Sequence, residues 1–209
     1  MRHVRFIPVV LFTALLSFAS ARGSNVAGSW PEATAICAVV AAATGVLLAS
    51  IAAWDAGSQD VTFLRSTSTS RARTAVLLAG PALAWGLASI LIGFMILAGF
   101  VYTAPVGGSP WFLVIISSLV WVVLCAVLGA GLGVLVRRRI LAALLAALLT
   151  LALCVVSACA DSAPASLRFL FFPGNGYELI ARQPRVASVA ISAVMVAALS
   201  ACVLAALTR

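Results

Sequence analysis

Few residues in this chain could carry catalytic or metal chemistry, and their spacing does not suit such chemistry. The chain has one histidine, His3, and five Asp or Glu residues. A Ser–His hydrolase would lack its base, and a metalloprotease would lack its pair of histidine ligands. The cysteines form no C-x-x-C pair and are expected to pack as small apolar side chains: Cys37, Cys125, Cys154, Cys159 and Cys202. We therefore expect no enzymatic activity and no catalytic, metal or cofactor site.

A glycine-rich stretch at residues 129–133 is the one pattern with a likeness to a phosphate-binding loop. It has no preceding strand and no Lys-Ser/Thr, and no Walker A sequence exists elsewhere, so the chain alone cannot hydrolyse ATP. Gly129 and Gly133 instead form a G-x-x-x-G face, which lets another helix approach closely. We predict that this face serves helix packing and that glycine faces of this kind contribute to dimerisation.

The composition predicts a polytopic helical membrane protein. Of 209 residues, 64% are hydrophobic and 9% are charged, and the mean hydropathy is +1.21. These values exclude a water-soluble globular domain and a disordered chain. Since about 20 apolar residues cross a bilayer, we predict an all-α fold with one transmembrane domain, residues 1–209. Its six spans are expected at residues 6–21, 33–54, 74–102, 111–136, 140–160 and 186–208.

The distribution of arginine orients these spans. With the N-terminus in the cytoplasm, nine of the 13 basic residues, all arginine, fall on the cytoplasmic side and four on the outer side. This imbalance follows the positive-inside rule. It predicts cytoplasmic termini, a cytoplasmic loop at residues 55–73 and an outer loop at 161–185. The net charge of +8 is thus interpreted as membrane orientation in a multi-pass plasma-membrane protein, not as nucleic-acid binding.

The first span has a second interpretation. A basic start, a short apolar core and the sequence Ala19-Ser-Ala21 are also the three parts of a secretory signal peptide. Cleavage after Ala21 would leave five spans and an external N-terminus. The orientation of the later spans is the same under both interpretations.

Both long loops contain apolar residues that a simple linker would not need. In residues 55–73, Asp60 is placed to cap a short helix that carries Val61, Phe63 and Leu64. This helix docks on a partner or lies at the membrane interface without one. The outer loop has an apolar arm and a tight turn, which predict a re-entrant hairpin or an aromatic anchor on the membrane surface: Phe171, Phe172, Pro173, Gly174 and Gly176.

The stretch from Phe63 to Arg73, followed by a long Ala/Leu span, resembles the permease subunits of type-2 ABC exporters. Residues 53–56 and 133–143 are also similar to that group. The resemblance implies six spans, a re-entrant outer loop, a separate ABC ATPase and dimerisation with an identical or different permease. It implies an ATPase-coupling helix formed by Asp60, Val61, Phe63, Leu64 and Arg65. The chain departs from the family pattern at Ser68 or Thr69, one of which stands where the family carries a proline. A non-transporting membrane scaffold or accessory subunit is the alternative function.

Overall fold

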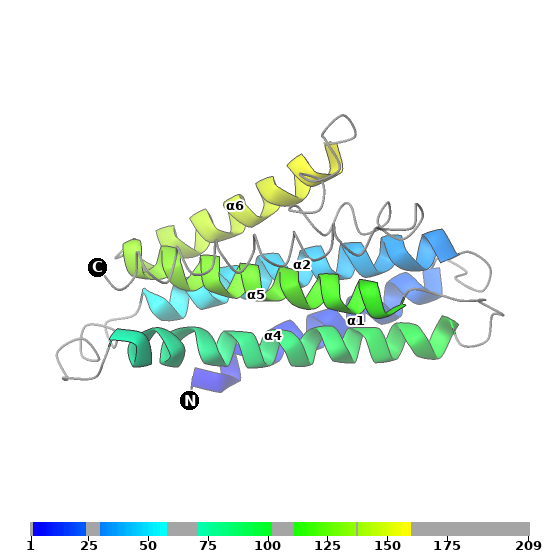
Figure 1. Ribbon diagram of the computed structural model, residues 1–209, viewed down its shortest axis with the longest axis horizontal. Helices are drawn as coiled ribbons and strands as arrows, with labels where there is room; N and C mark the ends of the chain where they lie inside the picture. Colours follow the sequence, from blue (N-terminus) through cyan, green and yellow to red (C-terminus); the bar gives the residue numbers. More distant parts are fainter. Residues whose placement is uncertain (1, 24–29, 58–70, 102–110, 137, 160–209) are drawn as a thin grey trace.

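A computed structural model shows the chain as a bundle of long apolar helices (Figure 1). It describes residues 2–23, 30–57, 71–101, 111–136 and 138–159. No strand occurs within these ranges, so the predicted all-α class is confirmed for this part of the chain. A short 3-10 helix, η1 (Arg2–Phe6), precedes five α-helices: α1 (Ile7–Gly23), α2 (Trp30–Ala56), α4 (Arg71–Val101), α5 (Trp111–Leu135) and α6 (Arg139–Cys159).

The five α-helices coincide with the first five predicted spans, and the largest shift at either end is three residues. The largest differences are at the starts of α2 and α4, which begin at Trp30 and Arg71, whereas the predicted spans begin at residues 33 and 74. Charges limit an apolar stretch, but they do not interrupt the backbone hydrogen bonds of a helix, because long basic side chains reach toward water from its end. The predicted sixth span, residues 186–208, lies outside the described residues.

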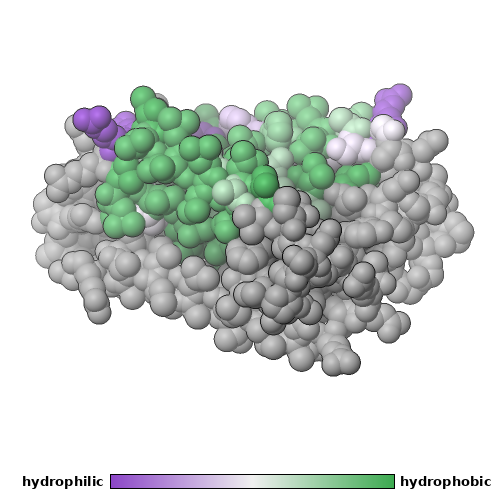
Figure 2. All heavy atoms as spheres, turned by 90° about the horizontal axis from the view of Figure 1, so that it is seen from above, coloured by the Kyte–Doolittle hydropathy of each residue, from purple (hydrophilic) through white to green (hydrophobic). Residues whose placement is uncertain are grey.

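Four of the described helices are long and apolar enough to cross a membrane. The qualifying segments are Val4–Gly23, Ile36–Ala56, Ala79–Phe100 and Ser118–Leu135. A fifth apolar segment, Arg139–Val155, is shorter. Figure 2 shows a face on which apolar side chains of the described residues form a broad area, with hydrophilic residues toward both ends of the long axis. This distribution suits a molecule that spans a lipid layer.

Consecutive helices run in opposite directions, and α2 lies at the centre of the bundle (Figure 1). It contacts α1, α4, α5 and α6, with its closest association to α5. Helix α6 packs on α2 and α5 near its start and diverges from α5 toward its end (Figure 1). Every described helix therefore packs on α2, and α2 sets the positions of the others.

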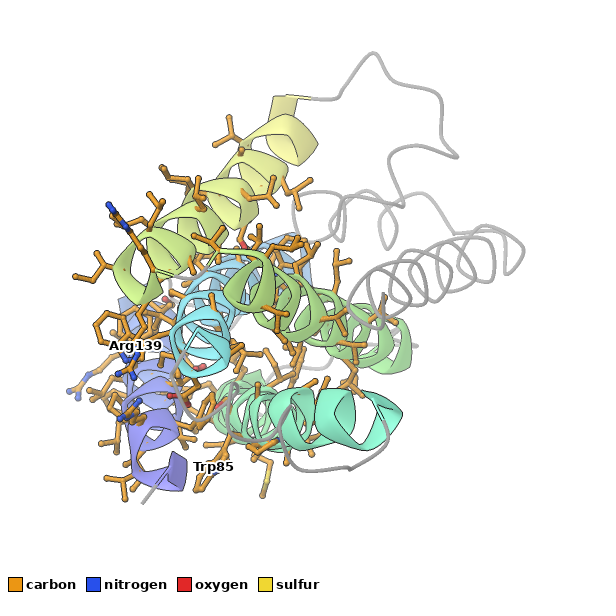
Figure 3. All side chains as sticks on the ribbon, turned by 90° about the vertical axis from the view of Figure 1, so that its left-hand side faces the viewer. Trp85 and Arg139 are labelled. Carbon is orange, nitrogen blue, oxygen red and sulfur yellow. The ribbon has the colours of Figure 1, made fainter. Side chains whose placement is uncertain are left out.

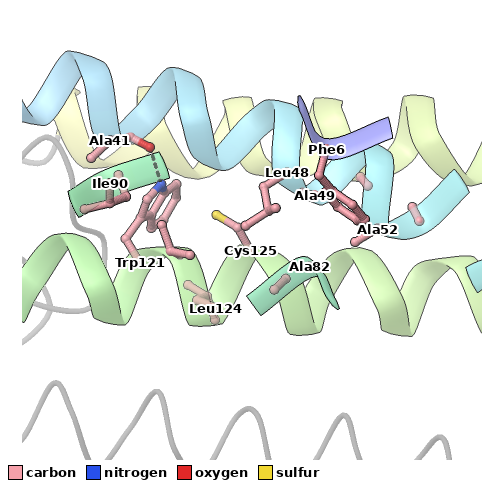
Figure 4. Close-up of a cluster of buried hydrophobic side chains, with 14 of the residues drawn as sticks. Phe6, Ala41, Leu48, Ala49, Ala52, Ala82, Ile90, Trp121, Leu124 and Cys125 are labelled. Atoms are coloured by element: carbon pink, nitrogen blue, oxygen red, sulfur yellow. Dashed lines mark hydrogen bonds between the residues drawn. The ribbon is translucent and has the colours of Figure 1, made fainter. Parts of the chain in front are cut away.

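Most of the core lies between α2, α4 and α5, and it also includes Phe6, Ala21, Ala142 and Ala146 (Figure 4). Trp121 is among its largest fully buried side chains. The indole Nε1 of Trp121 donates a hydrogen bond of 3.1 Å to the backbone oxygen of Ala41. Gly45 leaves room for this ring, because a Cβ at that position would collide with the indole nitrogen. A Cβ at Gly86 would lie 2.6 Å from Leu48 Cδ2. Large side chains of one helix thus fill the space that glycines of the next leave open.

Small residues at intervals of four form the buried stripes of the outer helices. On α1 the stripe is Val9, Thr13, Ser17 and Ala21, and on α6 it includes Ala142, Ala146 and Thr150. Residues four apart share one face of a helix. In lipid, helices gain little by burying leucine, so small residues that allow close backbone approach dominate the interfaces. Most of the leucines of α6 accordingly face outward, and Leu153 packs against the core.

Candidate functional site at the arginine-rich end of the bundle

A groove with an arginine-lined mouth lies at the end of the bundle where α2 finishes and α6 begins. Its volume is about 540 Å³, and its lining combines one indole, two guanidinium groups and aliphatic side chains: Trp54, Arg138, Arg139, Ile140, Leu141 and Leu144. Trp54 comes from α2, whereas the other residues come from the start of α6 and the residue before it. Figure 3 looks along the bundle from this end and labels Arg139. We call this feature the Arg138/Arg139 groove.

Glycines allow the two walls of the groove to come together. A Cβ at Gly57, just after α2, would lie 3.4 Å from the oxygen of Gly133 and 3.5 Å from the Cα of Arg139. A Cβ at Gly133 would collide with the oxygen of Ala53. The turn between α5 and α6 can therefore lie directly against the end of α2, which places Arg139 beside Trp54.

The charges at this end are unevenly paired. Arg5 of η1 forms an ion pair with Asp55 of α2, with Arg5 Nη1 2.6 Å from Asp55 Oδ1. Neither Arg138 nor Arg139 has an ion-pair partner among the described residues, and the first turn of α6 contains no acidic residue. With Asp55 already matched, the groove carries positive charge. The arrangement can bind an anion, but it presents no nucleophile or general base for catalysis.

The predicted packing face of Gly129 and Gly133 lies against α2 of the same chain. A Cβ at Gly129 would collide with the oxygen of Ala49, one helical turn from the Ala53 oxygen that faces Gly133. The backbones of α2 and α5 approach closely at both points, as a G-x-x-x-G face permits. This face is therefore occupied within the chain and is not free for the dimer contact that we expected of glycine faces.

A cluster of hydroxyl groups between α1, α2 and α4 was not predicted from the sequence. The hydroxyls of Thr13 and Thr44 lie 2.9 Å apart, and Thr13 also contacts the oxygen of Val9 at 2.7 Å. A Cβ at Gly93 of α4 would lie 3.0 Å from the hydroxyl oxygen of Ser17. The small residues four apart on α1 are the sequence signal that could have indicated this cluster.

The remaining predicted residues lie partly outside and partly inside the described ranges. The ATPase-coupling residues (Asp60, Val61, Phe63, Leu64, Arg65) and the outer-loop residues (Phe171, Phe172, Pro173, Gly174, Gly176) lie outside the described residues. Among the described cysteines, Cys37 and Cys125 are buried, Cys154 is half-buried, and all three are free thiols. The described residues contain no group of three or more His, Cys, Asp or Glu side chains that could hold a metal ion.

Comparisons with known proteins found no match for this chain. No protein-family model matches the chain, and neither a curated protein nor a solved structure is similar to it. The functional argument therefore rests on the residues and their arrangement.

Proposed function

We propose that the chain is the membrane-spanning permease subunit of an ABC-type exporter that is powered by a separate ATPase. In this proposal the chain is a multi-pass protein of the plasma membrane with six spans and both termini in the cytoplasm. The arginine-rich end of the bundle, which carries Arg5, Arg138 and Arg139, faces the cytoplasm in accordance with the positive-inside rule.

The position of the connection between α2 and α4 carries the proposal. The last turn of α2 closes with a hydrogen bond of 2.9 Å from the nitrogen of Gly57 to the oxygen of Ala53. Helix α4 begins at Arg71. The end of α2 and the start of α4 both lie at the arginine-rich end of the bundle (Figure 1). The two helix ends that flank residues 58–70 therefore lie at the same end of the bundle. This supports the proposal, because the resemblance to type-2 permeases implies a coupling segment between these two helices.

The experiment is affinity purification of the tagged chain in mild detergent, with identification of any ABC ATPase that is retained. We expect the Phe63→Ala/Leu64→Ala variant to lose the ATPase while still inserting into the membrane, since aromatic and aliphatic anchors dominate such contacts. Phe171→Ala/Phe172→Ala is the matched control, because it removes similar side chains from the predicted outer loop. Retention of the ATPase by the first variant would contradict a coupling role for these residues.

A non-transporting scaffold or accessory subunit is the second candidate function. Its support is the contact between α2 and α5, where Gly129 and Gly133 lie against the α2 backbone and leave no space for cargo between these two helices. If no ATPase is retained by the wild-type chain under conditions that keep the bundle folded, the scaffold replaces the permease as the proposed function.

The proposed permease works as a homodimer or as a heterodimer with another permease. Because α2 covers the Gly129 and Gly133 face, the second subunit needs a different surface, and the exposed leucines of α6 offer one. Co-purification of two differently tagged copies of the chain distinguishes a homodimer from the alternatives.

A further inference from the structure

The Arg138/Arg139 groove joins a positively charged mouth to an apolar wall. Arg138 is exposed and Arg139 is half-buried, so both guanidinium groups are within reach of solvent at the end of the bundle. Below them Ile140 is 65% exposed, Leu141 47% and Leu144 56%. A ligand that fills this groove must present negative charge at one end and hydrocarbon at the other.

We propose that the groove binds an anionic glycerophospholipid from the membrane leaflet at the arginine-rich end. The phosphate lies between Arg138 and Arg139, since arginine presents several N–H donors in a planar arrangement that matches phosphate oxygens. The glycerol region lies against Trp54, and one acyl chain lies along α6. This proposal does not depend on the proposed exporter function.

Charge favours an anionic lipid over a zwitterionic one. The nearest described carboxylate, that of Asp55, is paired with Arg5, and the first turn of α6 is free of acidic residues. The two groove arginines therefore keep their full attraction for an anion. A zwitterionic headgroup brings its own cation close to them and cancels much of this attraction.

The apolar wall favours a lipid over a small soluble anion. From Leu144 the exposed apolar surface continues along α6 through Leu148, Leu151 and Val155. These side chains form a track parallel to the helix, which an acyl chain can follow into the bilayer. A free phosphate ion would contact the arginines but would leave this surface uncovered.

Trp54 fixes the depth at which the headgroup sits. Its side chain is 36% exposed, and it is adjacent in sequence to the ion-paired Asp55. Tryptophan is enriched at the membrane–water interface because its ring is apolar and its N–H is polar. The indole thus marks the level of the glycerol region, with charge on one side and hydrocarbon on the other.

The experiment measures lipid binding to the full chain in mild detergent by native mass spectrometry. Phosphatidylglycerol and phosphatidylcholine with identical acyl chains are titrated in parallel, and glycerol 3-phosphate serves as the headgroup without chains. We expect phosphatidylglycerol to bind more tightly than phosphatidylcholine and glycerol 3-phosphate to bind weakly. Arg138→Gln/Arg139→Gln should weaken phosphatidylglycerol binding by about fivefold for each arginine, and Trp54→Ala should weaken it as well.

Arg22→Gln is the matched control, because Arg22 is an exposed arginine in the last turn of α1, outside the groove. Its phosphatidylglycerol affinity should equal that of the wild type. The single variant Arg138→Gln is included because removing an exposed charge leaves the packing intact. Equal binding of the two lipids by the wild type, unchanged binding by the arginine variants, or an equal loss in Arg22→Gln would overturn the proposed site. Tight binding of glycerol 3-phosphate would identify a soluble anion as the ligand and also overturn it.

Discussion

At the scale of single residues, glycines in the same kind of apolar helix have different roles. Gly129 and Gly133 of α5 lie against the backbone of α2, whereas Gly80 and Gly99 of α4 have no described neighbour within 4 Å of an added Cβ. A backbone atom cannot move aside as a flexible side chain can. The cost of adding a methyl group therefore depends on the neighbouring helix and not on the glycine itself.

Gly129→Ala should destabilise the bundle by about 1–3 kcal/mol, the usual cost of overpacking a close contact. Gly80→Ala should instead leave stability unchanged or raise it by up to about 1 kcal/mol, because alanine is the better helix former. Thermal unfolding of the two variants in mild detergent measures this difference. Equal stability of both variants would contradict the close contact between α2 and α5.

Hydroxyl groups provide a second specific contact at this scale. Thr13 and Thr44 each lie 2.7 Å from the carbonyl oxygen four residues earlier and 2.9 Å from one another. The two hydroxyls have only two hydrogens for these three contacts. One hydroxyl therefore donates to the carbonyl oxygen of its own helix, and the other donates to that first hydroxyl. The pair joins α1 to α2 with either hydroxyl as the cross-helix donor.

A double-mutant cycle with Thr13→Val and Thr44→Val should give a coupling energy of about 0.6 kcal/mol, the average for hydrogen bonds between membrane helices. Valine keeps the branched shape and removes only the hydroxyl. The cycle is measured by unfolding in mild detergent, and Thr150→Val, which removes a hydroxyl bonded within α6, is the control. Additive effects of Thr13→Val and Thr44→Val would show that the two side chains do not interact.

At the scale of elements, α6 has the most strongly divided surface among the described helices. Ala142, Ala146 and Thr150 are buried, while Leu144 and Leu148 are 56% and 61% exposed. The small stripe allows α6 to lie close to the central helix α2, and the leucines are left for lipid or for a second subunit. The division follows from the repeat of small residues every four positions.

Ala146→Leu should therefore destabilise the bundle by about 1–3 kcal/mol, the usual cost of overpacking, because Ala146 is buried. Leu148→Ala should change stability little, because the side chain of Leu148 is 61% exposed. Thermal unfolding of the two variants in mild detergent measures the difference. The opposite pattern would place the other face of α6 against α2.

At the scale of the whole molecule, antiparallel helices divide the arginines between the two ends. Arg5, Arg138 and Arg139 lie at one end, and Arg22 lies in the last turn of α1 at the other. The arrangement agrees with a bundle that crosses a membrane, with the greater positive charge on one side. Orientation in the membrane follows if the arginine-rich end is cytoplasmic.

Labelling of Ser66→Cys and Gly107→Cys with a membrane-impermeant maleimide tests this orientation. Both sites lie outside the described residues, in the two connections that flank α4. We expect Gly107→Cys to react in intact cells and Ser66→Cys to react only after permeabilisation. Reaction of both cysteines from the same side would contradict the topology.

The positions of the helices could be predicted from the sequence alone, as the first five predicted spans show. The length and boundaries of an apolar stretch are properties of the linear chain, because each membrane-crossing helix satisfies its backbone hydrogen bonds within itself. The G-x-x-x-G face was equally visible, since residues four apart share one side of a helix. These features need no knowledge of which helices are neighbours.

Only the tertiary structure decided what each helix face contacts. Gly129 would allow close approach of any neighbouring helix. Its contact with Ala49 arises because α2 lies at the centre of the bundle. The Arg138/Arg139 groove needs Trp54, which is more than 80 residues away in sequence. Lipid solvates all apolar faces almost equally, so hydropathy does not rank the possible helix pairs. Shape complementarity between particular side chains selects the pairs, and it acts only once the helices are packed.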